Sequence, residues 1–133
     1  MSAVTASLLP DPPARQHLEA DLQRSVNAFL RYGAPADLVH FAVPNGLMRS
    51  KKARAIAQGE GVRAGIPDLC IIWRGRPIFL ELKTPRGRLA AHQRQMHQKL
   101  VQAGAEVLVC RDLDEVEDGL RQLGVPLLAS VAA

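Results

Sequence analysis

The chain is poor in cysteine and in aromatic residues. Its 133 residues include two cysteines, Cys70 and Cys110, and 4% of the residues are aromatic. The cysteines lie in apolar, strand-like runs, and no Cys-x-x-Cys or Cys/His spacing suggests a zinc site. We therefore expect reduced thiols buried in the core.

Long hydrophobic runs are also missing. No apolar stretch approaches the roughly 20 residues that cross a bilayer. The first residues, "MSAVTASLLPDPPARQ", lack the basic region of a signal peptide. We therefore predict no membrane partner and a cytoplasmic protein.

The remaining composition is that of a soluble globular domain with excess positive charge. Hydrophobic residues make up 47% and charged residues 23%, with a formal net charge of +4 and a pI near 9.6. A chain of this length buries about two thirds of its unfolded surface as one domain. The basic balance favours a polyanionic partner such as nucleic acid.

Periodicity and turn signals divide the chain into a tail, a domain and a second tail. Residues 1–14 are rich in Ser, Ala and Pro and predict a flexible tail, the domain spans residues 15–125, and residues 126–133 form a C-terminal tail. The expected elements are a helix over 15–32, a strand over 38–43, a basic helix or loop over 47–61, strands over 67–73 and 77–84, a helix over 88–104, a strand over 105–110 and a helix over 111–124. This order predicts an α/β fold with a mixed central sheet flanked by helices.

Charged residues interrupt the two strands of the predicted hairpin, "GIPDLCIIWRGRPIFLELKT". Alternation along a strand puts Glu81 and Lys83 on one face, and the hairpin can bring Asp68 to the same face. Neighbouring carboxylates repel unless a proton or a cation lies between them, and Mg²⁺ prefers oxygen ligands. The pattern favours a divalent metal site over the alternative, a salt bridge at a strand end.

Pro67-Asp68 followed by Glu81-Leu82-Lys83 resembles the PD-(D/E)XK nuclease motif. A closer resemblance, over roughly residues 15–112, is to the VRR-NUC family of that superfamily, especially its small stand-alone phage and prophage members. It rests on "HLEADLQ", "FAVPNGLMRS", "GVRAGIPDL", "FLELKTPRGRLAAHQ" and "LVQAGAEVLVCRD", in that order. The resemblance implies a metal-dependent nuclease with a restriction-endonuclease-like αβββαβ core.

The resemblance also implies roles for individual residues. Asp68 and Glu81 correspond to the metal-binding carboxylates, joined by the backbone carbonyl of Leu82, and Lys83 to the catalytic lysine. Glu19 corresponds to the family's helical acid. At about 100° per residue Glu19 falls inside the apolar arc of its helix, so it either serves the site or reaches water at the rim.

Gln93 matches the glutamine of the family's Leu-Ser-x-x-Gln block, where this chain has Ala90 instead of serine. Two roles stay open for Gln93: an edge of the active site, or a cap on the helix that follows. Loss of the serine is expected to weaken the start of that helix by about 1 kcal/mol.

The resemblance and the charge together predict hydrolysis of DNA phosphodiesters with Mg²⁺ or Mn²⁺. Structure-selective cutting, such as Holliday-junction resolution, fits better than site-specific restriction because no base-reading helix is visible. Two symmetric cuts would need a homodimer. The candidate DNA contacts are Asn45, Arg49, Lys51, Lys52, Arg54, Arg86 and Arg88.

Two rival interpretations use the same residues. The first is a non-catalytic nucleic-acid-binding module that kept the fold, against which the intact Asp68, Glu81 and Lys83 argue. The second is a nuclease of the HNH type built on histidines and Asn45. No ββα-metal spacing links those histidines, which are His40, His92 and His97, and we expect the latter two to be exposed on a helix.

Overall fold

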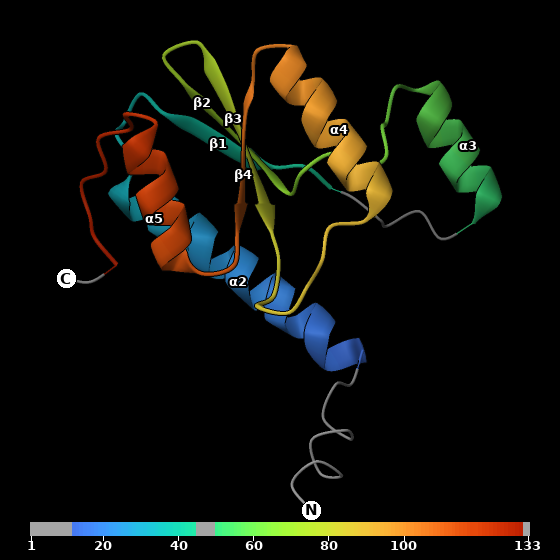
Figure 1. The fold of residues 1–133 in the computed structure, drawn as a ribbon, viewed down its shortest axis with the longest axis horizontal. Helices are drawn as coiled ribbons and strands as arrows, with labels where there is room; N and C mark the ends of the chain where they lie inside the picture. Colours follow the sequence, from blue (N-terminus) through green and yellow to red (C-terminus); the bar gives the residue numbers. More distant parts are fainter. Residues whose placement is uncertain (1–11, 45–49, 132–133) are drawn as a thin grey trace, which may run out of the picture. The chain divides into compact units, whose positions relative to one another are not determined.

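The computed structural model describes residues 12–44 and 50–131 (Figure 1). Its elements, in chain order, are α2 (Pro12–Gly33), β1 (Val39–Ala42), α3 (Lys51–Gly59), β2 (Leu69–Trp73), β3 (Arg76–Leu82), α4 (Ala91–Gln102), β4 (Glu106–Cys110) and α5 (Leu113–Gln122). This is the predicted order, and the α/β fold class with a mixed sheet is confirmed. The segment that the sequence left open as helix or loop contains a helix, α3.

The described chain forms two compact units. The first contains the chain up to Ala34, the segment Leu82–Gly87 and the chain from Cys110 onward. The second contains Pro35–Glu81 and Arg88–Val109, and therefore most of the sheet with α3 and α4. We describe each unit by itself.

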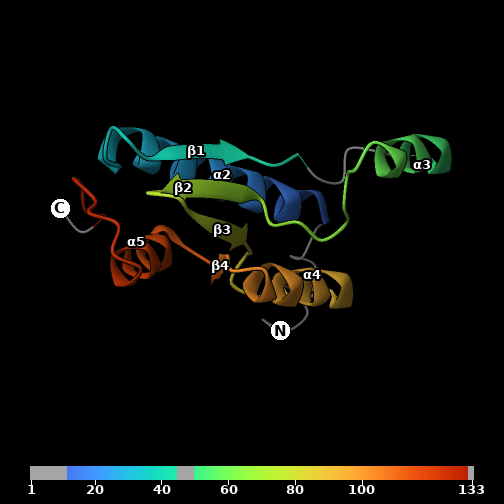
Figure 2. The same ribbon diagram turned by 90° about the horizontal axis from the view of Figure 1, so that it is seen from above.

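The sheet of the second unit has the strand order β1-β2-β3-β4, which Figure 2 shows in sequence from one edge to the other. β1 pairs with β2 and β2 pairs with β3, both antiparallel. The arrows of β3 and β4 point the same way in Figure 1, so the sheet is mixed. A crossover through α4 joins these two strands, as parallel neighbours require.

The β2–β3 hairpin turns through Arg74 and Gly75. Both have positive φ, 50° and 77°, as the two-residue hairpin turns of matching twist require. The Arg74 guanidinium lies 4.9 Å from the centre of the Trp73 ring. The turn fixes the register, in which Leu69 faces Leu80 and Cys70 faces Phe79. Continued by one pair, the same register sets Asp68 opposite Glu81.

Gly65 lets the loop before β2 approach the first turn of α4. Its φ is +83°, in the left-handed region that glycine adopts at little cost. A Cβ at this position would lie 2.6 Å from the carbonyl oxygen of His92. Only a residue without a side chain fits this loop against α4.

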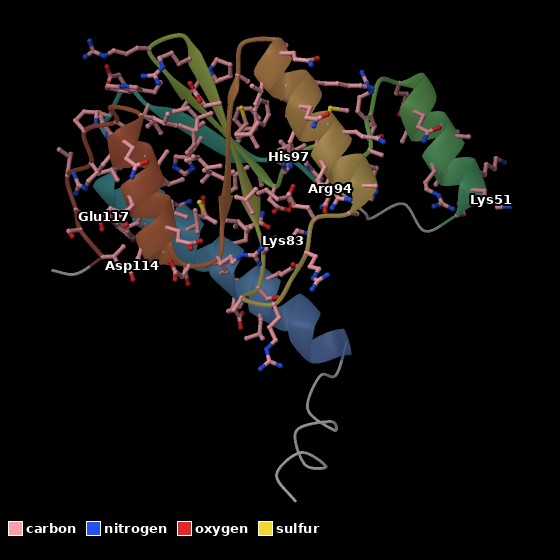
Figure 3. The ribbon with its side chains drawn as sticks, in the orientation of Figure 1. Lys51, Lys83, Arg94, His97, Asp114 and Glu117 are labelled. Carbon is pink, nitrogen blue, oxygen red and sulfur yellow. The ribbon has the colours of Figure 1, made fainter. Side chains whose placement is uncertain are left out.

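The cap of α3 explains why the basic segment forms a helix. Ser50 precedes the helix in an extended conformation, and its hydroxyl accepts a hydrogen bond from the Ala53 N–H at 3.0 Å. Lys51, Lys52 and Arg54 are exposed, and the side chain of Lys51 extends from the outer side of the helix (Figure 3).

In the first unit α2 contacts α5, and apolar residues of both helices are buried. Val26 and Leu30 of α2 and Val116 and Leu120 of α5 are at most 1% exposed. α5 begins at a side-chain cap, because the Asp112 carboxylate accepts from the Glu115 N–H at 2.8 Å.

The segment after α5 is fastened to both helices of this unit. The Leu128 N–H donates to the Gly33 carbonyl at 2.6 Å, and the Val131 N–H donates to Glu117 at 2.8 Å. The predicted tails and domain boundaries remain predictions. Residues 1–11 and 132–133 lie outside the described residues, and α2 begins at Pro12, three residues before the predicted start.

Both cysteines are buried and free, as predicted. Burial raises the pKa of the Cys110 thiol to about 12, with help from the negative charges of Glu115 and Asp112. Burial also raises the pKa of Cys70. Thiols with raised pKa values are poor nucleophiles, so these cysteines are packing residues. Among the described residues, no helix is both long and apolar enough to cross a membrane.

Candidate active site

Asp68 and Glu81 line one pocket of the second unit. Asp68 immediately precedes β2 and is half-buried, and its backbone carbonyl accepts from the Val43 N–H at 2.8 Å. Glu81 is the penultimate residue of β3 and is 2% exposed. The hairpin therefore brings the two predicted carboxylates together in the way that the alternation of the sequence indicated.

The pocket has a volume of about 480 Å³ and is formed by four parts of the second unit: α3, the loop before β2, the β2–β3 hairpin and the start of α4. Acidic and basic groups both face it. Its polar lining residues are Arg54, Gln58, Arg63, Asp68, Glu81, His92 and Gln93. A pocket with two carboxylates and two guanidinium groups can hold a cation and a phosphate together.

Gln93 contacts both the start of α4 and Glu81, so neither of the two roles that the sequence left open is excluded. Its Oε1 accepts from the Ala90 N–H at 2.9 Å, which caps α4 from within because the alanine side chain has no acceptor. Its Nε2 donates to Glu81 Oε2 at a longer 3.4 Å. The same side chain thus caps the helix and touches a candidate metal ligand.

His97 is not exposed, and that prediction was wrong. His97 lies on α4 (Figure 3). It is 9% exposed, and its Nε2 lies 3.1 Å from Glu81 Oε1. The reason is helical spacing, because position 97 is four residues after Gln93 and shares its face of α4. His92 is exposed, as predicted, and lines the pocket.

Glu19, Leu82 and Lys83 belong to the first unit, so each is described there. Glu19 is half-buried on α2, and Leu82 is 3% exposed at the end of β3. Lys83 is half-buried, and its N–H donates to the Cys110 carbonyl at 3.1 Å. Their catalytic roles remain predictions.

Among the predicted DNA contacts, Arg54 lines the pocket. Arg86 and Arg88 are exposed, and Asn45 and Arg49 lie outside the described residues. Arg63 also lines the pocket, although nothing singled it out within the block "GVRAGIPDL" that contains it.

Arg111 was also missed. Its Nη1 donates to the carbonyls of Thr84 and Gly87 at 2.7 and 2.6 Å, which fixes the turn that follows Lys83. The only signal in the sequence was its place in the block "LVQAGAEVLVCRD". Because one guanidinium holds both carbonyls, Arg111 defines the path of the chain directly after the candidate lysine.

The pocket suits a hard divalent cation by the chemistry of its donors. No group of three or more His, Cys, Asp or Glu side chains that could hold a metal occurs in the described ranges 12–44 and 50–131. Mg²⁺ does not need such a cage, because it keeps several waters and is commonly held by one or two carboxylates. Asp68 and Glu81 meet that requirement, and each carboxylate oxygen of Glu81 can accept more than one contact.

A family model described as the VRR-NUC domain matches residues 14–112, which is most of the chain. The match assigns the protein to the nucleases. Within them, the chain belongs to the VRR-NUC family.

Two solved structures support the fold. One, described as a "VRR_NUC domain protein", is 22% identical, with a TM-score of 0.59 over 84% of this chain and 97% of the other. A second, described as a "VRR_NUC domain", is 24% identical, with a TM-score of 0.54 over 79% of this chain and 95% of the other. The comparison with curated proteins finds no match.

Proposed function

We propose that the protein is a metal-dependent DNA endonuclease whose centre is the Asp68–Glu81 pocket. The observation that carries the proposal is the pair of carboxylates, one just before β2 and one near the end of β3, that line one pocket with Arg54 and Arg63. Membership of a nuclease family supports the reaction class. The net charge of +4 supports a polyanionic substrate.

In this proposal Asp68 and Glu81, with the Leu82 carbonyl, hold Mg²⁺ or Mn²⁺. A bound divalent ion supplies Lewis-acid activation of water and offsets negative charge on a phosphate. Lys83 follows Glu81 by two residues and orients the attacking water, and its ammonium stabilises the charge that develops on the phosphoryl oxygens. Glu19 contributes a further carboxylate, as the family resemblance implies.

The guanidinium groups of the pocket position the DNA backbone. Arg54 projects from α3 and Arg63 from the loop before β2, so a phosphate in the pocket would meet cations from two directions. Lys51, Lys52, Arg86 and Arg88 are also exposed and are further candidates for contacts with the DNA backbone. Such contacts bind the backbone without reading sequence, which favours recognition of DNA shape.

The finer parts of the proposal rest on the family resemblance. They are cleavage of branched DNA in the manner of a Holliday-junction resolvase, action as a homodimer that makes two symmetric cuts, and a stand-alone phage or prophage origin with a cytoplasmic location. Two equivalent cuts across a two-fold junction require two sites related by a two-fold axis.

A binding module without catalysis is the alternative. Both proposals use the basic surface, but only the nuclease needs the carboxylates. A nuclease of the HNH type is disfavoured, because His97 is engaged with Glu81 rather than grouped with His92.

The test uses the purified 133-residue chain with labelled four-way junction, flap, duplex and single-stranded DNA, in Mg²⁺, Mn²⁺ or EDTA. We expect cleavage with either metal, none in EDTA, and the fastest cutting of the branched forms. The Asp68→Asn variant should bind DNA without cutting it. Binding of DNA with no cleavage in any metal would favour the binding module. Equal rates on all four substrates would contradict only the selectivity for DNA shape and would leave the nuclease proposal in place.

The place of Glu19 needs its own variant. Glu19→Gln is nearly isosteric, so a residue that serves the site should lose cleavage with little change in thermal stability. Normal turnover in this variant would remove Glu19 from the mechanism and leave it as a rim residue of α2.

A further inference from the structure

The Glu81 carboxylate is held by two donors from successive turns of one helix. His97 Nε2 lies 3.1 Å from Oε1, and Gln93 Nε2 lies 3.4 Å from Oε2. The two residues are four apart in α4, which places them on one face. Each oxygen of the carboxylate therefore has its own protein donor.

These two contacts offset the free-energy cost of burying the Glu81 carboxylate. A carboxylate that is 2% exposed loses most of its hydration, and burial without hydrogen bonds is strongly unfavourable. A metal-binding carboxylate is deprotonated and can only accept, so in a Glu81 that binds a metal the imidazole presents its Nε2–H to Oε1. His97 is itself buried, so solvent does not compete strongly for that hydrogen.

Gln93 is already tied down at its other end. Its Oε1 accepts from the Ala90 N–H, which fixes the plane of the amide at the start of α4. The 3.4 Å contact of its Nε2 is long, so the shorter contact from His97 is the stronger constraint on Glu81. The carboxylate thus takes its orientation mainly from the imidazole.

We propose that His97 is a positioning residue that holds Glu81 in the orientation in which its carboxylate binds the metal. The proposal rests on the proposed function of the Asp68–Glu81 pocket. His97 does not touch the substrate. It fixes the rotamer of Glu81, so that the ligand need not be ordered when the cation arrives.

A purely structural buried pair is the competing explanation, and conservative variants separate the two. His97→Leu replaces the imidazole with an apolar side chain of similar size and so removes the donor. His97→Gln keeps a side-chain N–H donor near the position of Nε2. Gln98→Leu changes an exposed residue of the same helix and serves as the matched control.

The main readout is the Mn²⁺ affinity of each variant of the 133-residue chain, measured by calorimetry beside its Tm. Loss of a group that orients a ligand typically weakens metal binding by about 10- to 100-fold, and we expect that loss in His97→Leu. His97→Gln should recover most of the affinity, and Gln98→Leu should match the wild type. Wild-type affinity in His97→Leu, or equal losses in His97→Leu and His97→Gln, would overturn the proposal.

A spectroscopic measurement on the wild-type protein covers the case in which His97→Leu does not fold. Nitrogen-15 correlation spectra of the imidazole should show a hydrogen on Nε2 in the metal-free protein, and a bare Nε2 would overturn the proposal. Failure of the proposed function is distinct, because the wild type itself would then bind no Mn²⁺ and cut no DNA. If the wild type binds and cuts while His97→Leu equals it, the positioning role alone is wrong.

Discussion

Two buried glutamates, one in each unit, are held in different ways. Glu81 meets an imidazole and an amide and lines a pocket. Glu117 on α5 meets the guanidinium of Arg121 at 2.8 Å, the Ser130 hydroxyl at 3.3 Å and the Val131 N–H at 2.8 Å (Figure 3). A carboxylate paired with a guanidinium and a backbone N–H makes a structural contact that holds the chain in place. A carboxylate that lines a pocket can still bind a ligand.

The causes of the two environments differ as well. The donors to Glu117 keep its pKa below the ordinary value, with the Val131 N–H first and the Arg121 guanidinium second. All of these donors lie within or after α5, so the contact is local. Glu81 lies on β3 and obtains its donors from α4, the helix of the crossover between β3 and β4. Burial of an acid therefore does not by itself identify a functional site. The hydrogen-bond partners of the carboxylate distinguish a functional glutamate from a structural one.

The sharpest test of the comparison is the same substitution at both glutamates. Glu81→Gln removes a charged ligand, and we expect cleavage to fall by about 100-fold or more with little change in Tm. Glu117→Gln should leave cleavage near the wild-type rate and lower Tm by a few degrees. Steady-state cleavage rates and thermal unfolding of both variants test this expectation. Equal losses of activity would contradict the distinction between a metal-binding and a structural glutamate.

Lys83→Met separates ligand chemistry from transition-state chemistry. The methionine keeps much of the apolar stem and removes the ammonium. We expect the cleavage rate to fall by about 100- to 1,000-fold, or roughly 3 to 4 kcal/mol, while Mn²⁺ and DNA still bind. Single-turnover kinetics with calorimetry checks the split. A normal rate in this variant would exclude Lys83 from the reaction.

Two glycines, one in each unit and each with close neighbours, extend the comparison of the two units to stability. Gly65→Ala forces a left-handed residue and a clash with the His92 carbonyl, so unfolding free energy should fall by about 1 to 3 kcal/mol or more, and metal binding should weaken. Gly33→Ala in α2 would bring its Cβ to 3.0 Å from that of Ala129, at an ordinary helical φ. We expect a loss below about 1 kcal/mol there, because alanine favours the helix. Urea unfolding measures both, and the reverse order would refute the packing argument.

Salt dependence distinguishes the arginines of the pocket from the lysines of α3. The double variant Arg54→Ala/Arg63→Ala should reduce the slope of log affinity against log salt by about 2 and should also slow cleavage at saturating DNA. Lys51→Ala/Lys52→Ala, which changes two exposed residues, should reduce the slope without slowing the saturated reaction. Unchanged slopes would make these residues an ordinary solvated surface.

The smallest expected effect is the pH dependence of Glu117. A lowered pKa in the folded state means a stabilising contribution that is complete above the ordinary value of 4.5 and is lost as pH falls through the lowered folded pKa. The Tm difference between wild type and Glu117→Gln should therefore shrink on acidification below about pH 4. A difference that stays constant down to pH 3 would show that the carboxylate charge contributes nothing to this contact.

Local chemistry explains why so much of the fold was predictable from the sequence. The Arg74–Gly75 turn and the period-2 pattern define the hairpin, and Asp112 with Glu115 defines the start of α5. These signals involve neighbours in the chain, so they survive without knowledge of the packing. The pairing of Asp68 with Glu81 follows from the same hairpin and was predicted for that reason.

The tertiary structure decided which side chains meet Glu81. The sequence pattern suggested that His97 is exposed, because one histidine on a polar helix carries no sign of its partner. In the folded structure this face of α4 lies against Glu81 of β3, and His97 and Gln93 contact its carboxylate. Arg63 lines the pocket from the loop that also contains the left-handed Gly65. The sequence alone determined the elements and the acidic pair, because turns, caps and alternation act between near neighbours, whereas contacts between distant residues depend on how the finished elements pack.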